Sequence, residues 1–129
     1  ARMDYNQLLK LIPGNFEGQL GLALLNQKDH HYTEALEQMN RLVEQFPDSA
    51  VAYAARGGIE REQNLLELAE YDYAEAMKKD AGNVDYILNR TDLLILLNRK
   101  QEARKELDKL VTLGVPRNGL SEYYKKVRK

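Results

Sequence analysis

The chain has 129 residues, of which 43% are hydrophobic and 30% charged, and its 19 basic and 20 acidic side chains leave a formal net charge of -1. A chain of this size buries about two thirds of the surface that its unfolded form exposes, so one domain with a real core is expected. The lack of cysteine excludes disulfides, cysteine-based zinc sites and thiol nucleophiles, and the near-neutral charge argues against a module that binds nucleic acid by neutralising phosphates.

No segment of the sequence could cross a membrane, because the apolar runs stay far below the roughly 20 residues that a spanning helix needs. The chain opens on Ala1, Arg2 and Met3 with no signal-peptide pattern after them, which is consistent with a processed start. Cysteine-free proteins occur on both sides of a membrane. The compartment therefore stays open between the cytoplasm and the periplasm or exterior after removal of a signal.

Apolar spacing and helix breakers predict helices from the start of the chain. A first helix is expected over Met3–Leu11, ahead of Pro13, and a second contains Leu22 and Ala23. Further on, apolar residues at steps of three and four alternate with breakers and predict helices at Tyr32–Phe46, Ser49–Gln63, Leu66–Lys79, Val84–Asn98 and Lys100–Leu113.

The series ends at Gly114 and Pro116, which are typical of the stop after a helix. A lone final helix is expected over Leu120–Arg128. No segment alternates between apolar and polar residues with period two, so the sequence predicts an all-α protein.

One register runs through these helices. Alanine recurs every 34 residues, and each alanine is followed four residues later by a bulky side chain: Ala1 with Tyr5, Ala35 with Met39, Ala69 with Tyr73, and Ala103 with Leu107. Pro13 and Pro47 keep the same step. A fixed period of this length is typical of repeat proteins, in which each unit buries its apolar face against its neighbours.

In these features the sequence resembles the tetratricopeptide repeat family over almost all of its length. The family has a 34-residue period, with W-x2-L-G-x2-Y in the first helix of each repeat and A-x3-F and a closing proline in the second. The second-helix half is well kept. The first helices match in part: the Leu-Gly positions read Leu22-Ala23, Arg56-Gly57 and Arg90-Thr91, the tryptophan column holds Gln19, Tyr53 and Ile87, and the tyrosine column holds Asn26, Glu60 and Leu94.

The resemblance implies an all-α, right-handed solenoid of antiparallel helix pairs. The chain would then consist of a half repeat at 1–14, repeats at 15–48, 49–82 and 83–116, and a C-terminal capping helix at 117–129. Small side chains let two helices approach closely. We therefore expect close contacts at three facing pairs, of which the last is the loosest: Ala23 with Ala35, Gly57 with Ala69, and Thr91 with Ala103.

No constellation of side chains predicts catalysis, a cofactor or a metal site. His30 and His31 are placed in a turn and lack the four spaced ligands of a structural zinc site. The Gly57-Gly58 pair lies within a helix pattern and lacks the spacing of a phosphate loop. Carboxylate pairs such as Glu60 and Glu62 fit solvated helix faces with ordinary pKa values. The protein is therefore expected not to be an enzyme.

The resemblance implies a binding groove, because first helices line the concave face in this family and hold extended peptides or partner segments. Carried over column by column, the groove would be lined by Leu20, Leu24, Gln27, Ala54, Gly58, Arg61, Leu88, Asn89, Asp92 and Ile95. The middle repeat offers small side chains there, which makes a shallow apolar trough with Arg61 and Asp92 as polar anchors. The alternative is that several of the leucines merely pack against neighbouring helices.

Family members that grip the C-terminal carboxylate of chaperones carry lysine and asparagine in these columns. Here the matching columns read Leu20, Ala54 and Leu88, then Leu24, Gly58 and Asp92. The expected partner is therefore a protein or peptide of another kind, of unknown identity.

Three alternatives stay open. The basic cluster of the last helix, Arg117, Lys125, Lys126, Arg128 and Lys129, could contact nucleic acid, although a solubilising cap is the simpler interpretation, with Leu120, Tyr123, Tyr124 and Val127 packed inward. The chain could also be the regulatory or docking part of a larger multidomain protein. The incomplete N-terminal repeat would leave an exposed end, through which a homodimer could form.

Overall fold

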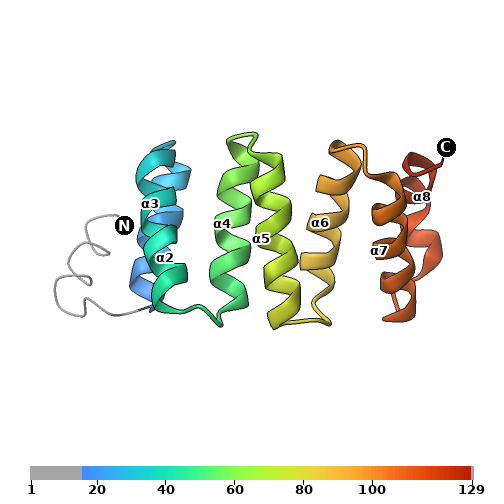
Figure 1. The fold of residues 1–129 in the computed structure, drawn as a ribbon, viewed down its shortest axis with the longest axis horizontal. Helices are drawn as coiled ribbons and strands as arrows, with labels where there is room; N and C mark the ends of the chain where they lie inside the picture. The colour runs from blue at the N-terminus through green and yellow to red at the C-terminus, as the bar shows by residue number, and fades with distance from the viewer. Residues whose placement is uncertain (1–15, 129) are drawn as a thin grey trace.

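The computed structural model describes residues 16–128, and every regular element in that range is a helix. In chain order these are α2 (Phe16–Lys28), α3 (Tyr32–Gln45), α4 (Ala50–Glu62), α5 (Leu66–Lys79), α6 (Val84–Leu96), α7 (Lys100–Thr112), the 3-10 helix η1 (Arg117–Leu120) and α8 (Ser121–Lys126). They stand side by side in one row (Figure 1). The predicted all-α solenoid is confirmed. The half repeat at 1–14, with its helix at Met3–Leu11, lies outside the described residues.

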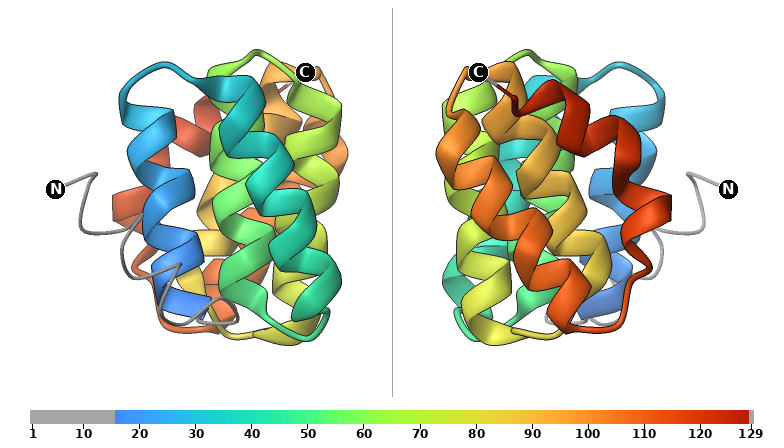
Figure 2. Two further views of the ribbon diagram at one scale, coloured as in Figure 1. Left: turned by 90° about the vertical axis from the view of Figure 1, so that its left-hand side faces the viewer. Right: turned by 90° about the vertical axis from the view of Figure 1, so that its right-hand side faces the viewer.

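Each helix packs against the one before it and the one after it in the chain, and the row has two layers (Figure 2). Figure 2 shows α2 and α8 on one side, with α3, α5 and α7 on the other. The first helix of each pair therefore contributes to one face of the molecule and the second helix to the opposite face. We call these the first-helix face, formed by α2, α4, α6 and α8, and the second-helix face.

The helix ends follow the signals in the sequence. Ser49 caps α4 by accepting a hydrogen bond at 3.2 Å from the backbone N–H of Ala52, and Asn83 caps α6 by accepting one at 3.1 Å from that of Tyr86. Both caps satisfy N–H groups that the first turn of a helix leaves free. The five helices predicted between Tyr32 and Leu113 agree with the structure to within two residues at each end.

The turn inside each helix pair repeats with the same 34-residue step. His30, Asn64 and Asn98 occupy equivalent turns and adopt left-handed backbone angles, with φ of 64°, 62° and 60°. Asparagine and histidine tolerate this region better than most residues with a side chain. Because His30 holds a turn and both it and His31 are exposed, the interpretation of these histidines as a solvated turn is confirmed.

The end of the chain differs from the prediction of one helix over Leu120–Arg128. A 3-10 turn ends at Leu120, and the α-helix that follows covers only Ser121–Lys126. Pro116 is extended, and Asn118 and Gly119 are weak helix formers, so the chain leaves the previous stop through a tighter turn. The predicted inward side remains: Leu120 and Val127 are buried, and Tyr123 and Tyr124 pack against the same cluster.

Small residues set the spacing of the helices. Ala23 and Ala35 are fully buried in one cluster. A Cβ atom added to Gly57 would lie 3.4 Å from the backbone carbonyl of Ala69 and 3.0 Å from the ring of Tyr73, which confirms that Gly57 faces Ala69. Thr91 is also fully buried, and its hydroxyl donates to the carbonyl of Ile87 at 2.7 Å.

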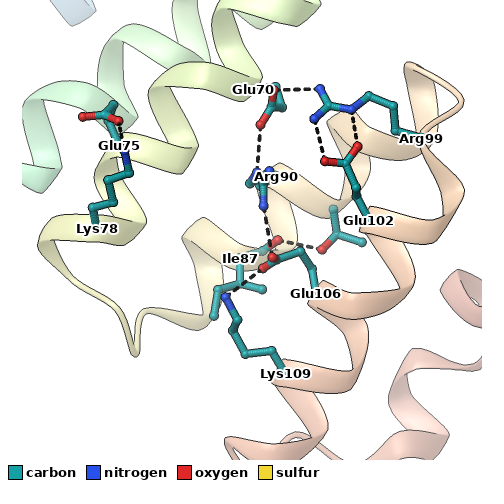
Figure 3. Close-up of polar contacts among 10 residues, drawn as sticks. Glu70, Glu75, Lys78, Ile87, Arg90, Arg99, Glu102, Glu106 and Lys109 are labelled. Atoms are coloured by element: carbon teal, nitrogen blue, oxygen red, sulfur yellow. Dashed lines mark hydrogen bonds and ion pairs between the residues drawn. The ribbon is translucent and has the colours of Figure 1, made fainter.

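Buried ion pairs repeat with the same step. Arg56 on α4 donates two hydrogen bonds to Asp72 on α5, at 2.7 and 2.9 Å, and the Asp72 side chain is only 1% exposed. Arg90, 34 residues on, donates to Glu106 on α7 at 3.0 Å and to Glu70 on α5 at 2.8 Å. Figure 3 shows how this second network continues through Arg99, which bonds both Glu70 and Glu102. Paired guanidinium forks of this kind fix two helices in register.

Glu60 corrects an expectation, because it is buried beside Asp72 and Arg56 instead of lying on a solvated face. Burial, together with a hydrogen bond to Asp72 and the negative charge of that residue, raises the pKa of Glu60 from 4.5 to about 9, against the lowering effect of Arg56. Two carboxylates this close do not both ionise readily. Glu60 is therefore a neutral acid at neutral pH.

The glycine pair provides a test of close packing. We expect Gly57→Val to lower the free energy of unfolding by about 1–3 kcal/mol, because the new side chain would collide with Tyr73. Gly58→Ala is the matched control: its Cβ would lie 3.5 Å from the Tyr73 hydroxyl, an ordinary contact, so the alanine should stabilise the helix by about 0.5–1 kcal/mol. Urea denaturation measures both, and equal effects of the two substitutions would contradict the packing described.

The pKa of Glu60 provides a second test. The folded protein keeps a proton on Glu60 that the unfolded chain releases above pH 4.5, so stability should fall as the pH rises from about 5 towards 9. Glu60→Gln removes this dependence. We expect the variant to exceed the wild type by about 1–2 kcal/mol at pH 8, after allowance for solvent screening, and by much less at pH 5. Denaturation at both pH values measures the difference, and parallel pH profiles would show that Glu60 is ionised in the folded protein.

Candidate functional site

The candidate site is the first-helix face, where side chains of successive helices meet. At its polar edge, Gln27 on α2 donates to Glu62 on α4, and the Tyr32 hydroxyl donates to the other oxygen of Glu62 at 3.2 Å. One helix pair further on, Arg61 on α4 lies 3.8 Å from Asp92 on α6. These contacts form two pairs that neighbour each other on α4, at Glu62 and Arg61, and they include three predicted groove residues, Gln27, Arg61 and Asp92. We call them the polar row.

The row continues onto the last helix. The pKa of Tyr123 on α8 is raised by burial, and also by the charge of Asp92 and a hydrogen bond to it, while Arg61 acts in the opposite direction. A hydroxyl that bonds a carboxylate holds its own proton more tightly. Tyr123 therefore lies beside Asp92, and the polar row reaches from α2 to α8.

The predicted apolar lining is divided between surface and core. Leu24 is 41% exposed. Leu20 is half-buried and packs against the cluster of α2, α3 and α4, whereas Leu88 and Ile95 are half-buried against the cluster of α6, α7 and the C-terminal end. Leu24 thus offers open apolar surface, and the other three side chains share their surface between helix packing and solvent.

The remaining predicted residues lie at the middle and far end of the face. Ala54 packs against the cluster of Ala69, Tyr73 and Leu93. Gly58 lies next to the Tyr73 hydroxyl, since a Cβ added there would be 3.5 Å from it. Asn89 donates from its side chain to the carbonyl of Asp85 at 2.9 Å, within its own helix. The middle of the face is therefore shallow, with small side chains above a tyrosine.

Sequence reasoning missed two tyrosines of this face: Tyr32, which begins a second helix, and Tyr123, which the sequence predicts only as part of the cap. Tyr73 is buried in the core, as the sequence predicts, and its hydroxyl lies next to Gly58. Tyr32 and Tyr123 are placed by tertiary contacts that the 34-residue pattern does not encode.

Within residues 16–128, no three His, Asp or Glu side chains come together in a way that could hold a metal ion. Over the same residues, no helix has both the length and the apolar character to span a bilayer.

The basic C-terminal end has a hollow of its own, of about 260 Å³, lined in part by Arg117, Lys125 and Arg128. Arg117 lies over the ring of Tyr124, 4.1 Å from its centroid, and the Tyr124 hydroxyl donates to Asp108 at 2.7 Å. The ring is therefore already engaged and does not offer the open stacking surface on which single-stranded nucleic acid binds. Lys129 lies outside the described residues.

Comparison with known proteins gives matches by structure and none by sequence. No family model and no curated protein matches the sequence. The crystal structure of MamA matches with a TM-score of 0.81 and 18% identity, covering 98% of this chain and 72% of MamA. YrrB, described as a TPR protein with an unusual peptide-binding site, matches with a TM-score of 0.78 and 18% identity, covering 88% of this chain and 59% of YrrB.

A third match is the Yersinia enterocolitica type III secretion chaperone SycD in complex with a peptide of the translocator YopD. Its TM-score is 0.71 at 16% identity, and the match covers 86% of this chain and 85% of SycD. Identities this low carry information about the fold alone. With its two-layered row of helix pairs and its 34-residue register, the chain has the tetratricopeptide-repeat fold, as its resemblance to that family implied.

Proposed function

We propose that the protein is a non-catalytic interaction module that holds an extended peptide or a segment of a partner protein on the first-helix face. The observation that carries this proposal is the continuity of that face: its polar row runs from Gln27 on α2, through Arg61 and Asp92, to Tyr123 on α8. A ligand crossing all four helices would meet a small set of placed polar groups beside exposed apolar surface, as binding sites for chains commonly offer.

The chemistry of the row favours a peptide ligand. Arg61 and Asp92 pair at 3.8 Å with 37% and 31% of their side chains exposed. Such exposed pairs contribute about 0–1 kcal/mol, so a peptide could replace this contact at little cost and bond both side chains. Leu24 supplies an exposed apolar anchor at the other end of the face.

The structural matches support the same class of function. YrrB is described as having a peptide-binding site, and SycD is described in complex with a peptide. Fold alone is a weak guide to function, so the proposal depends on the face of this chain. We keep as alternatives a regulatory or docking part of a larger protein, a homodimer through the N-terminal end, and a nucleic-acid contact at the basic C-terminal end. The last is disfavoured by the engagement of Tyr124.

The test uses 12-residue peptides from a phage-displayed library, selected on the wild-type protein and counter-selected on the double variant Leu24→Glu/Arg61→Ala. We expect selected peptides to bind the double variant at least tenfold more weakly in fluorescence anisotropy, because it loses the apolar anchor and one polar group of the row. Circular dichroism should show unchanged helix content.

Leu113→Glu is the matched control, since Leu113 is 45% exposed at the end of α7. It should leave affinity within twofold of the wild type. The proposal is wrong if no peptide survives counter-selection, or if the control weakens binding as much as the double variant.

A further inference from the structure

The second-helix face carries an apolar patch that the other helix pairs lack. Leu65, Leu68 and Tyr71 follow one another from the start of α5 along one side of it and are 40%, 53% and 56% exposed. Large apolar side chains gathered on a surface mark interaction sites more often than scattered ones do. We call these three residues the α5 patch.

The other two helix pairs show which residues the fold accepts at the positions of the α5 patch. One period before the α5 patch, the equivalent positions on the neighbouring pair hold His31, Glu34 and Glu37; one period after it, they hold Arg99, Glu102 and Lys105. All six of these side chains are polar or charged. Because the three positions have the same place in the fold, helix packing alone does not call for apolar residues there.

The α5 patch borders a cleft of about 340 Å³ between α3 and α5, above α4. Figure 1 shows α4 standing between these two helices. Leu36 and Asn40 form the α3 side, and Arg56, Glu60 and Asp72 form the floor. The exposed leucines and tyrosine are therefore the rim of a hollow with a polar base.

One oxygen atom at that base lacks a hydrogen-bond partner. Glu60 is only 7% exposed, yet its Oε1 atom has no hydrogen-bond partner. Buried polar atoms are almost always bonded. The neighbouring guanidinium of Arg56 is already committed to Asp72 and to Asn40. Beside its contact with Asp72, Glu60 thus presents an oxygen, Oε1, that has no hydrogen-bond partner at the bottom of a hollow with an apolar rim.

The charged groups that line the cleft indicate the charge of the ligand that would fill it. Two carboxyl groups, Glu60 and Asp72, and only one cation, Arg56, line the cleft. The next hollow along this face, between α5 and α7, is instead lined by Lys78 and Lys109. A cation brought to Glu60 would favour its ionised form, so the carboxylate would be available to a basic ligand group.

We propose that the cleft between α3 and α5 docks a short segment of a partner protein that carries one lysine or arginine between apolar side chains. The apolar side chains cover the α5 patch and Leu36, and the basic side chain reaches Glu60. The patch is too small for a second copy of the chain, because it has three residues and a stable interface takes about 20–30 residues from each partner. This site lies on the face opposite to the proposed peptide groove and is independent of it.

The test pans a phage-displayed library of 12-residue peptides on the wild-type protein and counter-selects on Leu68→Glu/Tyr71→Lys. These substitutions place at 68 and 71 the residues that α7 carries at 102 and 105, so the fold should be retained; Leu68→Glu alone is the fallback if it is not. Selected peptides should contain a basic residue within four positions of two apolar ones, and should bind the double variant at least tenfold more weakly.

Two further variants show whether binding depends on this cleft and on its buried carboxyl. Leu96→Glu, at a leucine that is 57% exposed on α6, is the matched control and should leave affinity within twofold. Glu60→Gln should reduce the preference for lysine over norleucine in the same peptide from about tenfold to below twofold.

The proposal fails if no peptide survives counter-selection, if surviving peptides lack a basic residue, or if Glu60→Gln leaves the preference unchanged. Leu24→Glu/Arg61→Ala should leave the affinity of the selected peptides within twofold of the wild type, and a loss as large as that in Leu68→Glu/Tyr71→Lys would overturn the assignment of the cleft.

Discussion

The two helices of each pair approach each other closely, and the other features of the fold follow from that contact. Ala35, Ala69 and Ala103 are all fully buried, and each is followed four residues later by a buried bulky residue that fills the space beside it. No pair can bury its apolar side alone, so the pairs stack, and the constant spacing repeats the geometry of each stack. Because this spacing is constant, the first helices line up along one face of the molecule and the second helices along the other.

The same close contact explains the buried charges. Close helices leave little water between them, so a charged side chain at the interface needs a partner. Arg56 with Asp72 and Arg90 with Glu106 meet that need at equivalent positions. In the middle pair a second carboxyl, Glu60, shares the same space and keeps its proton. The middle pair thus contains one carboxyl more than its ion pair needs.

A repeat protein contains its own comparison, because equivalent positions experience the same packing. Where the backbone conformation repeats, as at the left-handed turns of His30, Asn64 and Asn98, the fold requires that conformation. Where equivalent residues differ, as at Leu68 between Glu34 and Glu102, the fold accepts either kind of side chain, and the exposed leucine needs another explanation. Comparison of equivalent positions thus separates residues that the fold requires, such as the small residues of the core, from residues that it does not require, such as the α5 patch.

The order of the residues was enough to predict the helices and most of their bounds, because breakers and caps are local signals that act within a few turns of the chain. The tetratricopeptide-repeat fold was implied by the resemblance that the 34-residue step carries. That resemblance also assigned Arg61 and Asp92 to one surface, where they pair, since both lie in groove columns of neighbouring first helices. The order of the residues misjudged the final helix, where Leu120 ends a 3-10 turn.

Which side chains stay open was settled by tertiary packing. Leu24 is exposed while Leu20, in the same helix, is half-buried, and Glu60 is buried where a solvated face was expected. The burial and the pKa of a side chain depend on neighbours that come from other helices. The 34-residue period determines which positions are equivalent, but it does not determine which side chains surround them.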